Sequence, residues 1–156
     1  TVPVALSPRG MRHAPLDGLS RITVMLGESG RWRGVLSKAR TFADRAGVPL
    51  RLVTVATGDS QDTAEIEKRT EALLAEVRLD LNGLDDQRVQ IVHAHSMSAA
   101  VLAMEWSRNE LAFLGSARLA QSGRLFLGPD ANKILRVLPV PLVAVPADPA
   151  DVGGGT

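Results

Sequence analysis

The sequence predicts an α/β fold in which helices cover both faces of a parallel sheet. Short apolar runs without polar alternation recur along the chain, and such runs suit strands that are buried on both faces. Amphipathic segments with apolar residues at helical spacing separate them. Because parallel strands need right-handed crossovers, this alternation predicts a three-layer α/β/α domain with five parallel strands. The 156 residues suffice for one such domain.

The first half of the chain supplies three of the strands and two helices. We expect strands at residues 22–25, 50–56 and 89–94, and helices at residues 33–46 and 62–81. Leu36, Ala39 and Ala43 share one face of the first helix, and a Gly-Val-Pro sequence ends it.

The second expected helix lies in an acidic stretch. Residues 61–86 hold eight acidic and three basic side chains, which leaves a net charge of −5. Such a surface is either an ordinary solvated helix face or a docking face for a basic partner.

The second half of the chain supplies the remaining two strands and two shorter helices. Strands are expected at residues 111–114 and 142–145, and helices at residues 96–106 and 130–138. A loop at residues 115–128 joins the fourth strand to the last helix. An apolar, strand-like piece at residues 2–6 and a linker rich in proline and glycine precede the domain.

Composition excludes several classes of function. The net charge of +1 gives no field that would attract nucleic acid or an anionic membrane surface, and five aromatic rings are few for stacking bases. No apolar run is long enough to span a membrane, so we expect no membrane insertion. The absence of cysteine rules out disulfides and thiolate chemistry and suits the cytoplasm.

The loop at residues 115–128 carries the strongest functional signal. Small residues before a helix N-terminus let backbone N–H groups approach an anion at the carboxyl ends of parallel strands. Gly115 and Gly128 have the spacing found in the phosphate-binding pattern of the universal stress proteins, in which G-x-x-G is followed by nine residues and then by Gly-Ser or Gly-Thr. The closing segment ILRVLPVPLVAVP is also similar to that family. The chain therefore resembles the universal stress proteins.

This resemblance implies a Rossmann-like, adenine nucleotide alpha hydrolase-like fold with strand order 3-2-1-4-5. It also implies that a nucleotide, if one binds, contacts Gly27, Gly115, Ser116, Arg118 and Gly128.

Three positions depart from the family pattern. Arg118 replaces a glycine, Pro129 replaces a serine or threonine, and Leu26 stands where an acidic residue usually faces the base. Pro129 has neither a hydroxyl nor a backbone N–H to offer a phosphate. We therefore expect a degenerate site without a cofactor. The alternative is that Arg118 and Arg124 supply the missing positive charge and that ATP with Mg²⁺ still binds.

Other polar residues give weaker signals. His93 and His95 lie two positions apart at the end of a strand, where they are either metal ligands or a polar contact. No third histidine or acidic residue lies near them in sequence, so we expect no metal. No serine lies in a G-x-S-x-G elbow, and no Walker motif is present. The chain is not expected to be an enzyme.

The last strand points to a partner. Leu142, Val143, Ala144 and Val145 are expected at the sheet edge, and in the family this strand pairs with its equivalent in a second domain. The resemblance thus implies a homodimer or a tandem-domain pseudo-dimer. Residues 1–20 are either a simple extension or the last strand of a preceding domain, whose residues 2–6 are placed to pair with the last strand.

The domain itself is expected at residues 21–147, with a flexible tail at residues 148–156. The sequence thus predicts a universal stress protein domain that acts in the stress response through dimerisation or regulation. Two alternatives remain, an ATP-binding stress sensor and a soluble regulatory domain of a transporter.

Overall fold

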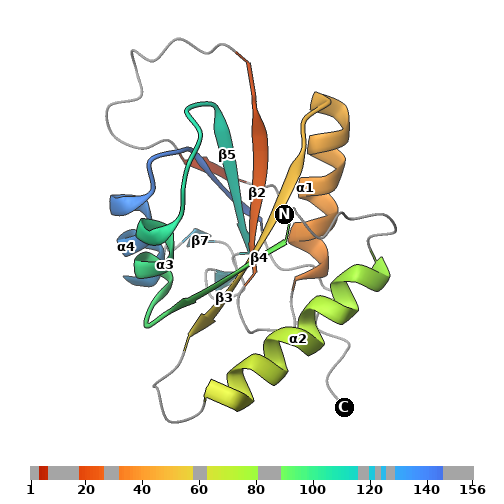
Figure 1. Ribbon diagram of the computed structural model, residues 1–156. Helices are drawn as coiled ribbons and strands as arrows, with labels where there is room; N and C mark the ends of the chain where they lie inside the picture. Colours follow the sequence, from red (N-terminus) through yellow and green to blue (C-terminus); the bar gives the residue numbers. More distant parts are fainter. Residues whose placement is uncertain are drawn as a thin grey trace.

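A computed structural model describes eight segments of the chain, which are residues 4–6, 18–26, 32–57, 63–80, 89–115, 120–121, 124–125 and 129–145. A six-stranded sheet runs through the middle of the molecule (Figure 1).

Five strands of the sheet are parallel and one is antiparallel. The parallel strands are β2 (Arg21–Leu26), β3 (Leu50–Thr57), β4 (Val89–Ala94), β5 (Glu110–Gly115) and β8 (Leu142–Val145). The sixth strand, β1 (Val4–Leu6), lies antiparallel to β8. The full order is β1-β8-β5-β2-β3-β4. The five parallel strands therefore have the predicted order 3-2-1-4-5, which is confirmed.

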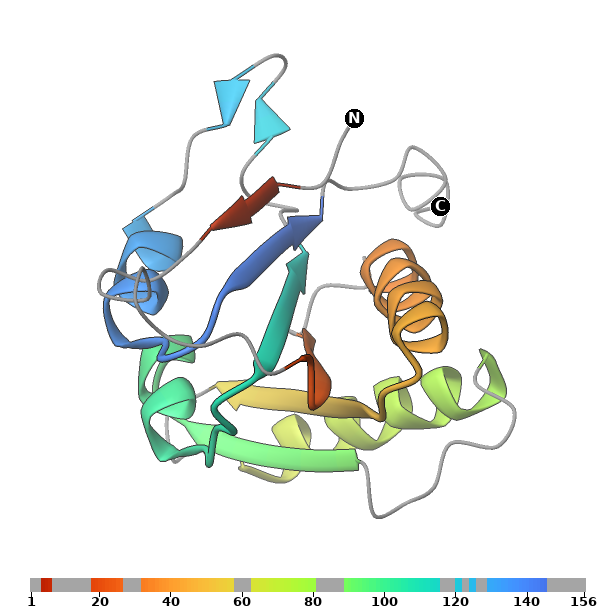
Figure 2. The same ribbon diagram turned by 90° about the horizontal axis from the view of Figure 1, so that it is seen from above.

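Helices cover both faces of the sheet, as the sequence predicted (Figures 1 and 2). On one face α1 (Arg33–Ala46) and α2 (Thr63–Asp80) pack through Leu36 and Val77 onto β2 and β3. On the other face lie α3 (Met97–Ala103) and α4 (Pro129–Val137), which contribute Val101 and Ile134 to a second core. The strands alternate between these two cores because successive side chains point to opposite faces.

Helix α1 has the predicted bounds because the predicted glycine, Gly47, ends it. Gly47 adopts a left-handed conformation with φ of 65°. Its N–H donates to Asp44 O over 3.3 Å, and the N–H of Val48 donates to Ala43 O over 3.1 Å. These bonds satisfy carbonyls at the end of the helix.

Helix α3 is shorter than predicted and ends at Ala103 instead of residue 106. Met104 is extended, with φ of −86° and ψ of 149°. The indole N–H of Trp106 donates to Val101 O over 2.9 Å, so a side chain satisfies a carbonyl of the last turn.

The stretch expected to be a loop contains regular structure. Strands β6 (Ala120–Gln121) and β7 (Arg124–Leu125) form an antiparallel pair. The sequence between them is Ser-Gly, which is a turn signal. Gly115 also belongs to β5 and not to the loop. The remaining residues of this stretch lie outside the described segments.

Candidate functional site

The carboxyl ends of the strands form the edge at which ligands bind in folds of this type. Strand β2 ends at Leu26, β3 ends at Thr57, and β5 ends at Gly115. Gly115 is opposite Val145 in the pairing of β5 with β8, so both strands reach this edge together. Of the predicted nucleotide-binding residues, Gly115 is therefore at the expected place. Gly27, Ser116, Arg118 and Gly128 lie outside the described residues.

Leu26 is a packing residue. Its side chain is 1% exposed and belongs to the core cluster that includes Trp32, Val35 and Leu36. An ionised carboxylate among such neighbours would be costly without a partner. The position that carries an acid in the family pattern thus contributes here to the apolar core beneath α1.

Pro129 is the first residue of α4, which begins one residue earlier than predicted and ends at Val137. This is the helix position at which a missing N–H costs least, because the first N–H groups have no partner within the helix. The same property removes one backbone donor from the N-terminus of α4.

Two histidines and a serine lie near the end of β4. His93 and His95 are both exposed. Among the described residues no group of three or more histidine, aspartate or glutamate side chains could hold a metal ion. Ser96 caps α3, since its hydroxyl accepts the N–H of Ala99 over 3.2 Å.

The predicted partner strand, β8, is fully buried and is not the edge of the sheet. Leu142, Val143, Ala144 and Val145 are between 1% and 9% exposed. The outer side of β8 is covered by β1, in the register Val4 to Ala144, Ala5 to Val143 and Leu6 to Leu142. The prediction that residues 142–145 form an edge is therefore wrong for this chain, whereas the predicted pairing of the N-terminal piece with the last strand is confirmed.

A buried ionic cluster, which the sequence analysis missed, lies at the opposite edge of the sheet. We call it the Glu110 cluster, and its members are Arg21, Thr23, Arg51 and Glu110. They come from the first residues of β2, β3 and β5, so the cluster lies at the amino ends of the strands. Glu110 has a side chain that is 0% exposed, against 28% for Arg21 and 11% for Arg51.

Two guanidinium groups hold the Glu110 carboxylate. Arg21 donates from Nε to Oε1 over 3.0 Å and from Nη2 to Oε2 over 2.8 Å. Arg51 Nη2 donates to Oε1 over 2.9 Å, and the Thr23 hydroxyl also donates to Oε1. The N–H of Ser107 donates to Oε2 over 2.8 Å. This carboxylate is therefore saturated with donors, and such charge-assisted bonds are the strong ones.

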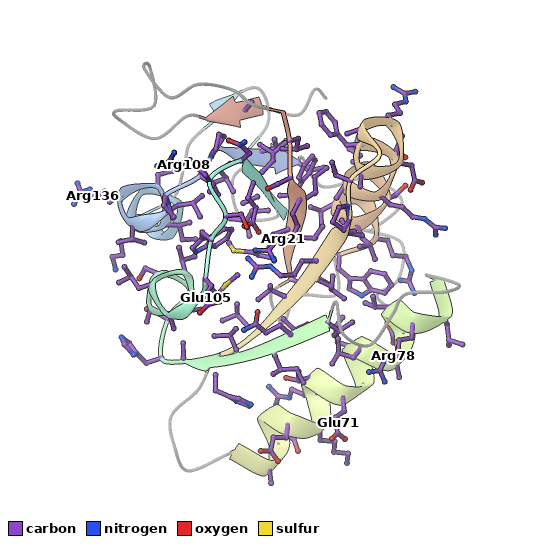
Figure 3. The ribbon with its side chains drawn as sticks, turned by 45° about the horizontal axis from the view of Figure 1, so that its top comes forward. Arg21, Glu71, Arg78, Glu105, Arg108 and Arg136 are labelled. Carbon is purple, nitrogen blue, oxygen red and sulfur yellow. The ribbon has the colours of Figure 1, made fainter. Side chains whose placement is uncertain are left out.

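The cluster also fixes the turn before β5. Arg51 Nη1 donates to Glu105 O over 3.0 Å, and its guanidinium lies over the Trp106 ring, 5.2 Å from the centroid. Arg21 projects from β2 toward the same turn (Figure 3). Three strands and one turn are thus joined through one carboxylate.

Burial and hydrogen bonding shift the pKa values of Glu110 and Arg51 in opposite directions. Burial alone would raise the pKa of Glu110, but the hydrogen bonds from Arg21, Thr23 and Ser107 together with the charge of Arg51 hold that pKa below its usual range. Burial lowers the pKa of Arg51, although the Glu110 carboxylate opposes this shift. The cluster is therefore ionised at neutral pH.

The Glu110 cluster lies at the amino ends of the strands, away from the carboxyl edge where ligands bind in this fold type. Its hydrogen bonds join β2, β3 and β5 to one another. The sequence contained one usable signal, because a charged residue stands at the start of two strands that are otherwise apolar.

Other charged residues lie on the outer surface of the helices. Glu71 and Arg78 lie on α2 and Arg136 lies on α4, whereas Arg108 lies in the turn between α3 and β5 (Figure 3). Among the described residues, no helix is both long and apolar enough to cross a membrane.

The sequence of this chain is similar to those of universal stress proteins. No protein-family model matches it. Universal stress proteins of Mycobacterium tuberculosis and Mycobacterium bovis are each 30% identical, over 93% of this chain and 54% of their own length. The chain therefore spans about half the length of these relatives.

Solved structures share the fold at lower identity. A crystal structure of a universal stress protein from Archaeoglobus fulgidus matches with a TM-score of 0.57 at 21% identity, over 96% of this chain and 51% of that one. A universal stress protein in complex with cAMP matches with a TM-score of 0.53 at 17% identity, over 85% of this chain and 100% of that one. The sequence relatives and the shared strand order together identify the domain formed by this chain as a universal stress protein domain.

Proposed function

We propose that this domain serves the stress response as a non-enzymatic module that binds a partner domain through the outer edge of β8. In this proposal the nucleotide site at the carboxyl edge is degenerate. The observation that supports the proposal is the antiparallel pairing of β1 with β8, in which a strand from outside the parallel sheet lies along the outer side of β8.

The composition of β8 supports association through this strand. Its four residues are apolar and buried, so the strand is already held in place by β5 and by the cores on both faces. Main-chain N–H and C=O groups on its outer side need a partner when they are removed from water. β1 supplies that partner in this structure, and an equivalent strand of a partner domain would supply it without rearranging the core.

Two described residues support the loss of nucleotide chemistry. The side chain of Leu26 is enclosed in the core, so the position at the end of β2 that is acidic in the family pattern offers no carboxylate to a base. Pro129 begins α4 and brings no backbone N–H to its N-terminus. Arg118, in place of the second motif glycine, adds a sequence argument in the same direction.

A nucleotide sensor is the second candidate function. One universal stress protein with this fold was solved in complex with cAMP, and Gly115 lies at the matching edge of the sheet in this chain. On this view Arg118 and Arg124 would provide the charge that replaces the lost donors.

Calorimetric titration with ATP and Mg²⁺ separates the two candidates. We expect no measurable heat from the natural sequence up to millimolar ATP. The double variant Arg118→Gly with Pro129→Ser restores two motif positions and should bind more tightly than the natural sequence if the motif alone limits affinity. Micromolar binding by the natural sequence would refute the degenerate-site proposal and favour the sensor.

A further inference from the structure

We infer that the outer edge of β4 binds a second copy of this chain, so that two β4 strands pair antiparallel across a two-fold axis. This contact lies at the end of the sheet opposite β1 and β8 (Figure 2). It is therefore separate from the association proposed above, and either one can hold without the other.

Strand β4 is the open edge of the described sheet. Its inner side pairs with β3 in an unbroken parallel register, from Leu52 opposite Val89 to Thr57 opposite Ala94. No described strand lies on its outer side, because β4 is the last strand in the order β1-β8-β5-β2-β3-β4. Main-chain N–H and C=O groups of an edge strand form a row on its outer side, which a further strand can bind.

The sequence of β4 lacks the features that normally protect an edge strand. Proteins keep such edges from pairing by short length, proline, charged side chains or β-bulges. Strand β4 has six residues, Val-Gln-Ile-Val-His-Ala, with no proline, lysine, arginine or acidic residue, and its register with β3 contains no bulge. The opposite edge strand, β1, has only three residues and directly follows Pro3. Of the two edges, β4 is therefore the one suited to pairing.

The α2 side of β4 exposes a large apolar side chain. Val92 belongs to the core on the α3 side of the sheet, whereas Val89 packs against the core that includes Val77 of α2. Because successive side chains alternate between the faces, Ile91 and His93 lie on the α2 side. Helix α2 packs over β3, so Ile91 remains 40% exposed. A partner strand at this edge would cover it.

The flank of α2 that faces the β4 edge carries both signs of charge. Glu76 Oε2 lies 3.9 Å from Arg33 Nη2 at the start of α1, so the flank with Glu76 faces α1. At about 3.6 residues per turn, the opposite flank holds two acidic and two basic residues, which are Glu67, Lys68, Glu71 and Arg78. Two such flanks can meet without net repulsion, and each offers opposite charges to the other.

A second copy of β4 fits this edge because the strand is complementary to itself. A two-fold axis through Ile91 places each Ile91 opposite its mate, Val89 opposite His93 and Gln90 opposite Val92, so no two like charges meet. At about 4.8 Å per strand spacing, β3 and its mate lie roughly 14 Å apart. The two α2 helices above them are then farther apart than the about 8–10 Å of direct helix packing. The two Ile91 side chains fill the space between them.

Opposite charges at Ile91 test this contact by sedimentation equilibrium over a range of protein concentrations. We expect the natural chain to form a dimer. Ile91→Lys and Ile91→Glu each place two like charges opposite one another, which should raise the dimer dissociation constant by about 10- to 100-fold. Because Ile91 meets its own mate across the axis, an equimolar mixture of the two variants pairs lysine with glutamate and should recover the dimer.

A matched control adds the same charge at a site away from β4. Leu79 lies on α2 and is 79% exposed, so Leu79→Lys should leave the dimer dissociation constant unchanged. Circular dichroism establishes that each variant is folded. Hydrogen exchange gives a second measurement that needs no variant, because outward-facing amides of β4 in the natural chain should become more protected as the protein concentration rises.

Three results would overturn the inference. If the natural chain stays monomeric up to millimolar concentration, the β4 edge does not bind a second copy and is left for a strand of a different protein. If Ile91→Lys dimerises as tightly as the natural chain, the contact lies elsewhere, and the proposed association through β8 survives. If the mixture of folded variants does not recover the dimer, Ile91 does not meet its mate across a two-fold axis.

Discussion

Replacing Glu110 with glutamine removes the charge at the centre of the Glu110 cluster while keeping the size of the side chain. The natural carboxylate accepts two hydrogen bonds from Arg21 and one each from Thr23, Arg51 and the Ser107 N–H. A glutamine side chain has one acceptor oxygen, and its NH₂ group must face donors. Two guanidinium groups then lack their counter-charge.

The expected cost follows from the exposure of the partners. Removing one partner from a buried ion pair costs about 3–5 kcal/mol. The side chains of Arg21 and Arg51 are 28% and 11% exposed, so water can partly solvate them after the substitution. We therefore expect the lower limit, about 3 kcal/mol. For a domain of this size that loss lowers the melting temperature by about 6–12 °C.

Urea unfolding at neutral pH, followed by circular dichroism, measures this loss. Glu105→Gln is a matched control, because it replaces a carboxylate with an amide in the turn before β5 and Glu105 is exposed. The control should stay within about 0.5 kcal/mol of the natural chain. A result within that same range for Glu110→Gln would show that the cluster does not stabilise the fold and would refute the reasoning.

Three further predictions concern single residues. Because the folded-state pKa of Glu110 lies below its ordinary value of 4.5, the stability that it contributes is present above that pH and is lost as the pH falls through the folded-state pKa. The difference in unfolding free energy between the natural chain and Glu110→Gln should thus be constant from pH 7 to about pH 5 and should shrink at lower pH in urea titrations; a difference that grows in acid would contradict this. Thr54→Val should stabilise the domain by about 1 kcal/mol because the buried Thr54 hydroxyl has no hydrogen-bond partner among the described residues, whereas Thr23→Val should destabilise it by about 1–3 kcal/mol because it removes bonds to Glu110 and Arg51. Equal effects of the two threonine substitutions in chemical denaturation would show that partnering is not the cause. Gly47→Ala should cost about 1 kcal/mol through backbone strain alone, since φ is 65° and no atom lies within 4 Å of the added methyl group, and Gly47→Asn should cost less in thermal melting.

Local patterns in the sequence were sufficient to predict most of the fold. Helix α1 has the predicted bounds because the apolar period and the Gly-Val-Pro stop act within a few residues of each other. Helix α3 was predicted three residues too long because its apolar pattern continues through Trp106. Its end depends instead on the Trp106 indole, whose ring also contacts Arg51 from a different strand. No local pattern contains that contact.

The sequence predicted where the candidate site lies in the fold, but it did not predict how the individual side chains pack. Gly115 is at the carboxyl edge as expected, since the motif and the strand order fix it together. The sequence also marked Leu26 as a departure, but only its burial reveals that it packs beneath α1. The sequence predicted that residues 2–6 pair with the last strand, and β1 does so, which places β8 inside the sheet and not at its edge.

The Glu110 cluster has a consequence for the order of folding. Arg21 and Thr23 lie 89 and 87 residues from Glu110 in the sequence, and Arg51 lies 59 residues from it, whereas Arg51 and Thr23 are only 28 residues apart. Closing the longer loops costs more chain entropy, so we expect β2 and β3 to associate before β5 brings in its carboxylate. Interactions completed after the rate-limiting step slow unfolding and leave the folding rate almost unchanged. We therefore expect the cluster to slow unfolding and so to prolong the lifetime of the native domain.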